Sequence, residues 1–147
     1  MSAAGEFNED GTYKTSCLVA LEAAHTDNRG YIQMLLNIPT HNVSMITSTK
    51  DSVRSNHYHL KDWHYIYVIS GSLDYYYREH SKDQQLNKFV AKKGDLIWTP
   101  PMEDHATVFL EDTEILALSC LPRDQEAYES DVRRIVLIDP ETLQSVV

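Results

Sequence analysis

The most informative part of this 147-residue sequence is Val-Arg-Ser-Asn-His-Tyr-His-Leu-Lys-Asp-Trp-His-Tyr-Ile-Tyr-Val-Ile-Ser-Gly at residues 53–71. From residue 64 it is rich in β-branched and aromatic residues and ends in Ser-Gly-Ser, as a strand followed by a turn would. Side chains alternate between the two faces of a strand, so His57 and His59 should project from one side. A bend through residues 60–63 would return His64 to that side.

Short β-type runs extend on both sides of this stretch, and Gly, Pro, Asn and Asp separate them. The predicted strands are residues 17–22, 31–37, 43–49, 64–69, 73–78, 88–91, 95–99, 106–110 and 114–121. Only residues 123–131 are expected to be helical, and residues 133–138 are expected to add a terminal strand or to cover an edge. So many short strands predict an all-β sandwich or a double-sheet jelly-roll barrel.

The composition indicates one globular domain. Hydrophobic residues make up 42% and charged residues 24% of the chain, as in ordinary folded proteins. We expect residues 1–12 to form a flexible arm and residues 13–147 to form the domain. Cys17 and Cys120 lie in apolar stretches and are expected to be reduced core thiols without chemistry.

The charge excludes two classes of partner. The formal net charge is -9, which disfavours nucleic acid and anionic membrane surfaces. No apolar run approaches the roughly 20 residues that would span a bilayer, and the first residues do not have the pattern of a signal peptide. We therefore expect a cytoplasmic protein that binds a small molecule or another protein.

The histidines resemble the first motif of the cupin superfamily, Gly-x5-His-x-His-x4-Glu-x6-Gly. His57, His59 and Gly71 match it, whereas His64 stands at the glutamate position and Asp51 at the first glycine.

The second cupin motif, Gly-x5-Pro-x-Gly-x2-His-x3-Asn, is also similar to this sequence. Gly94, Pro100 and His105 match it, whereas Met102 and Phe109 replace the glycine and the asparagine. The two motifs together imply the cupin double-stranded β-helix, a jelly-roll barrel of the RmlC-like kind.

The resemblance implies a divalent metal ion, because cupins usually bind one at these motif positions. The implied ligands are His57, His59, His64 and His105. Imidazole binds most divalent transition metals, so zinc, iron, nickel, manganese and copper all remain open. Four neutral ligands would leave the ion its full +2 charge and favour an anionic or enolate-like group.

Two further segments resemble nucleotide-sugar enzymes. Residues 53–59 are similar to the Arg-Gly-x-His-Tyr stretch of dTDP-sugar 3,5-epimerases and of cupin-type capsule-sugar epimerases, and residues 27–31 resemble their Asp-x-Arg-Gly-aromatic element. The resemblance implies that Arg54 and Arg29 contact a nucleotide sugar, which suits the donor fork of a guanidinium. Related epimerases exchange the strand that contains the second element between subunits, which implies a homodimer.

If His57 binds a metal ion, the enzyme needs another residue as its base. In the sugar epimerases the matching histidine removes a proton without metal, but a metal-bound imidazole has no free lone pair for this. Tyrosines from the strands beside the histidines are the alternative. The turn at residues 70–72 does not determine which side chains of the next strand face inward, so either Tyr75 with Tyr77 or Tyr76 alone would enter the barrel. We select Tyr75 and Tyr77 as catalytic candidates.

The leading prediction is a metal-dependent epimerase or isomerase of a keto-sugar, possibly nucleotide-linked, that acts through an enediolate. The alternatives are a non-haem metal dioxygenase, a lyase of a small oxygenated metabolite, and a non-catalytic sugar-binding cupin.

Overall fold

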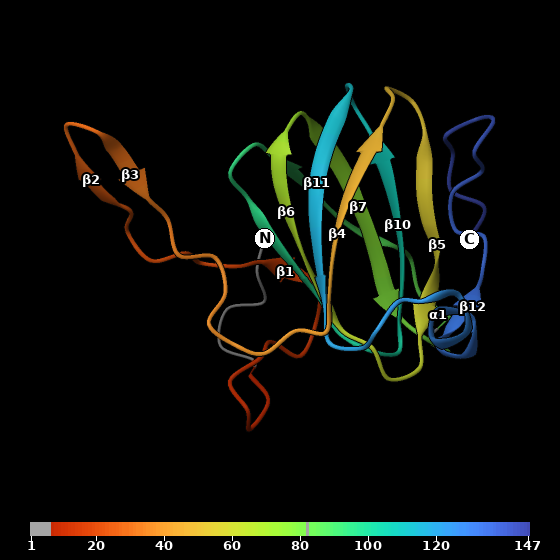
Figure 1. The fold of residues 1–147 in the computed structure, drawn as a ribbon. Helices are drawn as coiled ribbons and strands as arrows, with labels where there is room; N and C mark the ends of the chain where they lie inside the picture. The colour runs from red at the N-terminus through yellow and green to blue at the C-terminus, as the bar shows by residue number, and fades with distance from the viewer. Residues whose placement is uncertain (1–6, 82) are drawn as a thin grey trace.

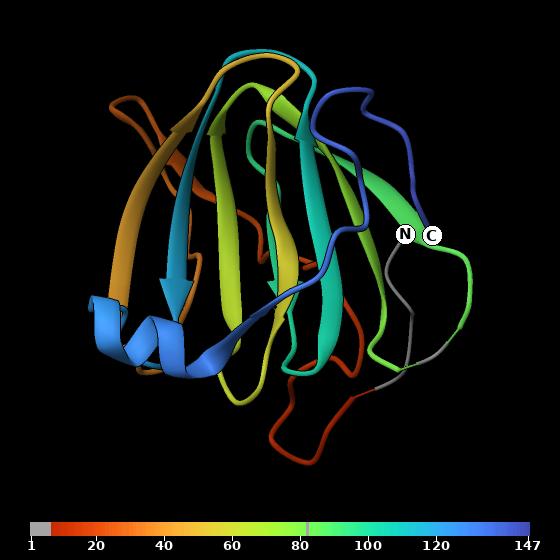
Figure 2. The same ribbon diagram turned by 90° about the vertical axis from the view of Figure 1, so that its right-hand side faces the viewer.

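Two antiparallel five-stranded sheets face each other in the computed structural model, which describes residues 7–81 and 83–147 (Figures 1 and 2). The first sheet has the order β1 (Cys17–Leu18), β9 (Leu96–Thr99), β6 (His64–Ser70), β11 (Thr113–Ser119) and β4 (Asn42–Ser48). The second has the order β12 (Val132–Arg134), β5 (Val53–His59), β10 (Glu103–Phe109), β7 (Ser72–Glu79) and β8 (Asn87–Lys92). This arrangement confirms the all-β jelly roll.

The helix lies where the sequence predicted it, and two of the predicted strands are shorter than expected. α1 (Gln125–Asp131) begins after Asp124, whose side chain accepts a hydrogen bond from the backbone N–H of Ala127, as an N-cap does. The strand predicted at 17–22 ends at Leu18, and the one predicted at 31–37 is reduced to β3 (Gly30–Ile32). The prediction failed there because the residues after Leu18 pack on the outer face of the first sheet through their side chains, and β3 pairs only with β2 (His25–Asp27) in a separate hairpin.

The period-two pattern determines which side chains form the core between the sheets. Ile66 and Val68 are buried there, together with Tyr75. Tyr65 instead packs on the outer face of the first sheet, in a cluster with Trp98. His64 therefore shares the inner face with Ile66, as the alternation predicted.

The outer face of each sheet is covered by a terminal segment. Residues 13–21 pack on the first sheet, where Cys17 is fully buried. Leu137 and Ile138 pack on the second sheet and are also fully buried. Both cysteines are reduced, although Cys120 is only half-buried.

Asn56 fastens the C-terminal segment to β5. Its side-chain oxygen accepts hydrogen bonds from the N–H groups of Leu137 (3.0 Å) and Ile138 (3.1 Å), and its amide donates to the Ile138 carbonyl (2.9 Å). Ser55 and Asn56 have φ of 68° and 53°, a left-handed conformation that Asn tolerates better than most residues. The strand that contains His57 is thus locally bent and tied to the chain's last segment.

The hairpin formed by β2 (His25–Asp27) and β3 projects away from the two sheets (Figure 1). Tyr31 and Ile32 on it are 67% and 65% exposed. Residues 1–6 of the expected arm lie outside the described part of the chain, and residues 7–13 form a turn in which Phe7 pairs with Tyr13. Within the described ranges, no helix has the length and apolar character to cross a bilayer.

Candidate functional site

A cavity of about 310 Å³ lies between the two sheets, lined by residues of β4, β5, β6, β10 and β11 and by three residues of the segment 123–134. Its wall combines apolar core side chains with histidine, arginine and hydroxyl groups. The lining residues are Ile46, Val53, Arg54, Ser55, His57, His64, Ile66, Thr107, Phe109, Ile115, Ala117, Arg123, Tyr128 and Arg134. An apolar pocket with a few converging polar groups is the usual form of a small-molecule site.

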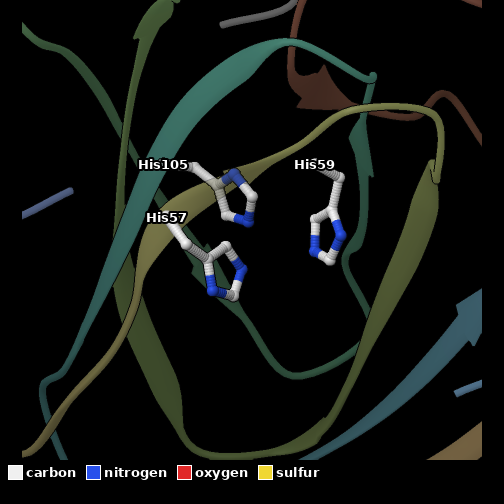
Figure 3. Close-up of side chains that lie close together, drawn as sticks. All are labelled: His57, His59 and His105. Carbon is white, nitrogen blue, oxygen red and sulfur yellow. The ribbon is translucent and has the colours of Figure 1, made fainter. Parts of the chain in front are cut away.

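Three histidines lie close together, as Figure 3 shows, and one of them, His57, lines the cavity. His57 and His105 lie opposite each other on the paired strands β5 and β10, and His59 follows on β5. One ring nitrogen from each of the three lies within 4.8 Å of the others. The spacing of His57 and His59 therefore predicted their common face correctly, and His105 approaches them from the neighbouring strand.

The hydrogen bonds of His59 and His105 leave one nitrogen of each ring free. Nδ1 of His59 lies 3.0 Å from a carboxylate oxygen of Asp131, and Nδ1 of His105 lies 3.0 Å from the backbone carbonyl of Glu103. Both partners can only accept, so both Nδ1 atoms carry the proton. The two Nε2 atoms are buried, face no hydrogen-bond partner in the described residues and retain their lone pairs.

This donor set fits a divalent transition metal. Histidine ligands usually donate one N–H to a carboxylate or a carbonyl and bind the ion through the other nitrogen. His59 and His105 have this arrangement, and a nitrogen of His57 completes a group of three.

Burial keeps the histidine cluster neutral. Desolvation, together with His59 and Arg123, lowers the pKa of His105 to about 3. Desolvation also lowers the pKa of His57, His59 and His64, and the positive charge of Arg123 adds to the effect at each. Neutral imidazole is the form that can bind a metal or accept a proton.

His64, the fourth expected ligand, lies next to the cluster but outside the group of three. Its ring centroid is 5.3 Å from that of His105 and 5.7 Å from that of His59. Its Nδ1 faces the guanidinium of Arg123 at 3.3 Å. The predicted bend before His64 is confirmed, because His64 and His59 are both buried beside the same site.

The two arginines predicted to bind substrate lie in different places. Arg54 lines the cavity, and its guanidinium donates to the Ser48 hydroxyl (2.8 Å) and the Thr47 carbonyl (2.9 Å), so these contacts leave its charge unneutralised. Arg29 lies on the projecting hairpin, where it pairs with Asp27 at 2.7 Å with 85% of its side chain exposed. Arg29 does not line the cavity of its own chain.

The side chains of Tyr75 and Tyr77 both point into the barrel, and Tyr76 packs on the outer face of the second sheet. The sequence had left open which of these two sets faces inward. The Tyr75 hydroxyl forms hydrogen bonds with Ser16 and Thr99, and burial raises its pKa. Burial also raises the pKa of Tyr77. Neither residue belongs to the cavity lining, and their catalytic role stays a prediction.

Three residues that line the cavity were not selected as site residues from the sequence: Arg123, Tyr128 and Arg134. Arg123 precedes α1, Tyr128 lies on α1, and Arg134 lies on β12 directly after it. The guanidinium carbon of Arg123 lies 5.5 Å from the Tyr128 ring centroid. Asp131, at the end of α1, orients His59 from the same segment. The polar side of the short helix was the available signal, but its docking position could not be inferred from it.

No protein-family model matches the sequence, and no curated protein sequence matches it. Several solved structures do match. A double mutant of the 3,4-ketoisomerase QdtA from Thermoanaerobacterium thermosaccharolyticum, in complex with TDP, has a TM-score of 0.68 at 19% identity, over 84% of this chain and 89% of its own. The RmlC epimerase of Mycobacterium tuberculosis has a TM-score of 0.70 at 14% identity, over 86% and 72%.

A third structure, the TDP-quinovose 3,4-ketoisomerase WlaRB of Campylobacter jejuni, has a TM-score of 0.66 at 20% identity, over 80% of this chain and 96% of its own. Identities this low establish the fold alone. The chain therefore has the RmlC-like cupin fold.

Proposed function

We propose that this RmlC-like cupin is an isomerase or epimerase of a keto-sugar linked to a nucleotide diphosphate. One observation carries the proposal: the neutral histidines His57 and His64 line one cavity together with Arg54, whose hydrogen bonds to Ser48 and Thr47 leave its charge unneutralised. Neutral imidazoles serve proton chemistry beside a carbonyl, and guanidiniums bind phosphate oxygens. Two structural neighbours support the choice of substrate: a 3,4-ketoisomerase in complex with TDP-4-keto-6-deoxyglucose and a TDP-quinovose 3,4-ketoisomerase.

The dimensions of the cavity suit the sugar rather than the whole substrate. About 310 Å³ is at the lower end of ligand pockets. A second hollow, of about 710 Å³, is lined largely by hydroxyl groups and shares Val53 and Arg54 with the first. The sugar ring would lie among the histidines and the nucleoside in the second hollow. Arg54 would then stand beside the diphosphate.

We further propose that His57, His59 and His105 hold a divalent transition metal. Bound there, the ion would polarise the substrate carbonyl and make the neighbouring C–H more acidic. The chain's own residues do the rest: Arg54 holds the diphosphate, the apolar wall excludes water, and Tyr128 exchanges a proton with the carbon beside the carbonyl. Tyr128 replaces Tyr75 and Tyr77 in this role because its ring lines the cavity.

The test is hydrogen exchange with solvent. TDP-4-keto-6-deoxyglucose, the ligand of one structural neighbour, would be incubated anaerobically in D₂O with zinc-loaded protein and followed by NMR. We expect deuterium to appear at a carbon next to the carbonyl. Tyr128→Phe should slow the exchange by at least about 100-fold, whereas Tyr67→Phe, which removes a hydroxyl on the outer face of the first sheet, should leave it unchanged.

Each alternative has its own outcome in this assay. Oxygen consumption with iron would indicate a dioxygenase, and saturable binding without exchange would indicate a sugar-binding cupin. Either result would refute the isomerase. Exchange that persists in metal-free protein and disappears in His57→Asn would retain the isomerase and make His57 its base.

A further inference from the structure

We infer that His64 is not a metal ligand: it carries its proton on Nε2 and donates it into the cavity, and Arg123 is the positioning residue that fixes this state. The inference deepens the proposed function, because it assigns the group that would meet the substrate carbonyl. It changes the expected four-histidine site into a site of three ligands and one donor.

The argument starts from the contact between Arg123 and His64. Nη2 of Arg123 lies 3.3 Å from Nδ1 of His64. A guanidinium has only donors, so Nδ1 must supply the lone pair of this hydrogen bond. A neutral imidazole whose Nδ1 is unprotonated has its hydrogen on Nε2. That nitrogen then has no lone pair with which to bind an ion.

Arg123 is itself held in place by a buried carboxylate. Its Nε and Nη2 donate to one oxygen of Asp62 at 3.1 Å and 3.0 Å, and the other oxygen accepts the N–H of Leu121 at 2.9 Å. The side chains of Asp62 and Arg123 are only 3% and 16% exposed. A buried, hydrogen-bonded ion pair of this kind defines the direction of the guanidinium.

The partners of the other histidines are of the opposite type. Asp131 and the Glu103 carbonyl are acceptors, so they place the proton of His59 and of His105 on Nδ1. Their Nε2 atoms are buried and have no hydrogen-bond partner among the described residues. The cluster therefore contains two tautomers. His59 and His105 carry the proton on Nδ1, whereas His64 carries it on Nε2 and is the histidine with an Nε2–H donor.

His64 and His57 are among the residues that line the cavity, whereas His59 and His105 are not. A substrate in the cavity would therefore meet the Nε2–H group of His64 directly. A fixed N–H donor at a carbonyl oxygen gains strength as negative charge develops there, as in an oxyanion hole. This places His64 at the oxygen and Tyr128 at the carbon of the reacting group.

The tautomers can be read directly by NMR. Protein labelled with ¹⁵N in its histidine rings would be recorded in metal-free form, and His64→Gln would identify the His64 signals by their loss. We expect a protonated Nε2 and an unprotonated Nδ1 for His64, and the reverse for His59 and His105. An unprotonated Nε2 on His64 would overturn the inference.

The role of Arg123 is tested by Arg123→Met in the same spectra. We expect His64 to lose its single tautomer. Arg78→Met is the matched control, because Arg78 also pairs with a buried aspartate, Asp104, at 3.0 Å but lies outside the cavity. An unchanged His64 tautomer in Arg123→Met would refute the positioning role. If Arg123→Met does not fold, the wild-type spectrum and the metal measurement below decide.

Zinc affinity, measured by competition with a chelator, is the second readout. His64→Gln should bind zinc within about threefold of the wild type, because an amide N–H can replace the donor, whereas His105→Gln should lose at least about 100-fold. Equal losses in both variants would refute the inference. Neither readout uses substrate, so a failure of the sugar chemistry would leave these results intact and would count against the proposed function alone.

Discussion

Asp131→Asn tests whether the carboxylate behind His59 prepares the metal site. Asp131 accepts three hydrogen bonds: one oxygen accepts from His59 Nδ1 (3.0 Å) and the Asp62 N–H (3.2 Å), and the other accepts from the Lys61 N–H (2.8 Å). The side chains of His59 and Asp131 are 2% and 9% exposed. Water therefore cannot replace a lost partner at His59.

An asparagine at position 131 can satisfy only part of this arrangement. Its single oxygen would serve either His59 and Asp62 or Lys61, and its NH₂ group would face the remaining donors. Each buried donor left without an acceptor costs about 1–3 kcal/mol. We expect the free energy of unfolding to fall by about 2–4 kcal/mol and zinc affinity to fall at least about tenfold, which is about 1.4 kcal/mol.

The assays are urea unfolding of the metal-free protein and a zinc titration against a chelator. Asp104→Asn is the matched control, because Asp104 is also buried and faces a histidine, His80, at 2.8 Å on the outer side of the second sheet. It should lose stability but keep its zinc affinity. Asp131→Asn protein that binds zinc like the wild type would refute the metal-orienting role of Asp131.

Four further predictions concern stability, metal and assembly. Gly71→Ala should destabilise the fold by about 2 kcal/mol or more, measured by thermal unfolding, because Gly71 has a φ of +90° and a Cβ there would lie 2.6 Å from the Asp112 carbonyl oxygen; an unchanged melting temperature would contradict this. Burial raises the pKa of Glu103 from its ordinary value of 4.5 to about 6, so its contribution to stability is present below pH 4.5 and is lost as the pH rises through 6. The stability of wild type relative to Glu103→Gln should therefore fall by about 2 kcal/mol between pH 4.5 and 7 in metal-free urea titrations, and parallel curves would refute the shift. Removing zinc present at 1,000 times its Kd should lower stability by about 4 kcal/mol, and calorimetry with and without chelator would detect no difference if the site were absent. Light scattering should give the mass of a homodimer, and Tyr31→Ser on the projecting hairpin should shift it toward the monomer; a monomeric wild type would disprove the dimer.

The sequence contained enough information to predict the fold and the centre of the site. The β-type runs and turn residues predicted the jelly roll, because alternation and turn chemistry are local properties. The same rule placed His57 and His59 on one face and His64 beside them. The cupin spacing added His105, which no local rule connects to the others.

Other parts of the site depend on packing that the sequence does not show. Arg123 reaches His64 because residues 121–134 cross the barrel opening, and that path depends on the buried Asp62. Tyr128 and Arg134 belong to the same segment. The sequence did not show that the hairpin containing Arg29 projects from the sheets. Turn residues indicate that a turn forms, but they do not determine where it lies in the fold.

The attachment of the chain's last segment by Asn56 has a consequence for biosynthesis. Leu137 and Ile138 follow Asn56 by 81 and 82 residues, so β5 cannot acquire these hydrogen bonds until that much more chain has left the ribosome. At ordinary translation rates the delay is roughly 4–16 s. During this interval β5 can pair with β10, but the bend at Ser55 and Asn56 beside His57 is not yet fastened. The nascent protein can therefore form most of its strand pairs, but not the pair of β5 with β12, before the bend beside His57 is fixed.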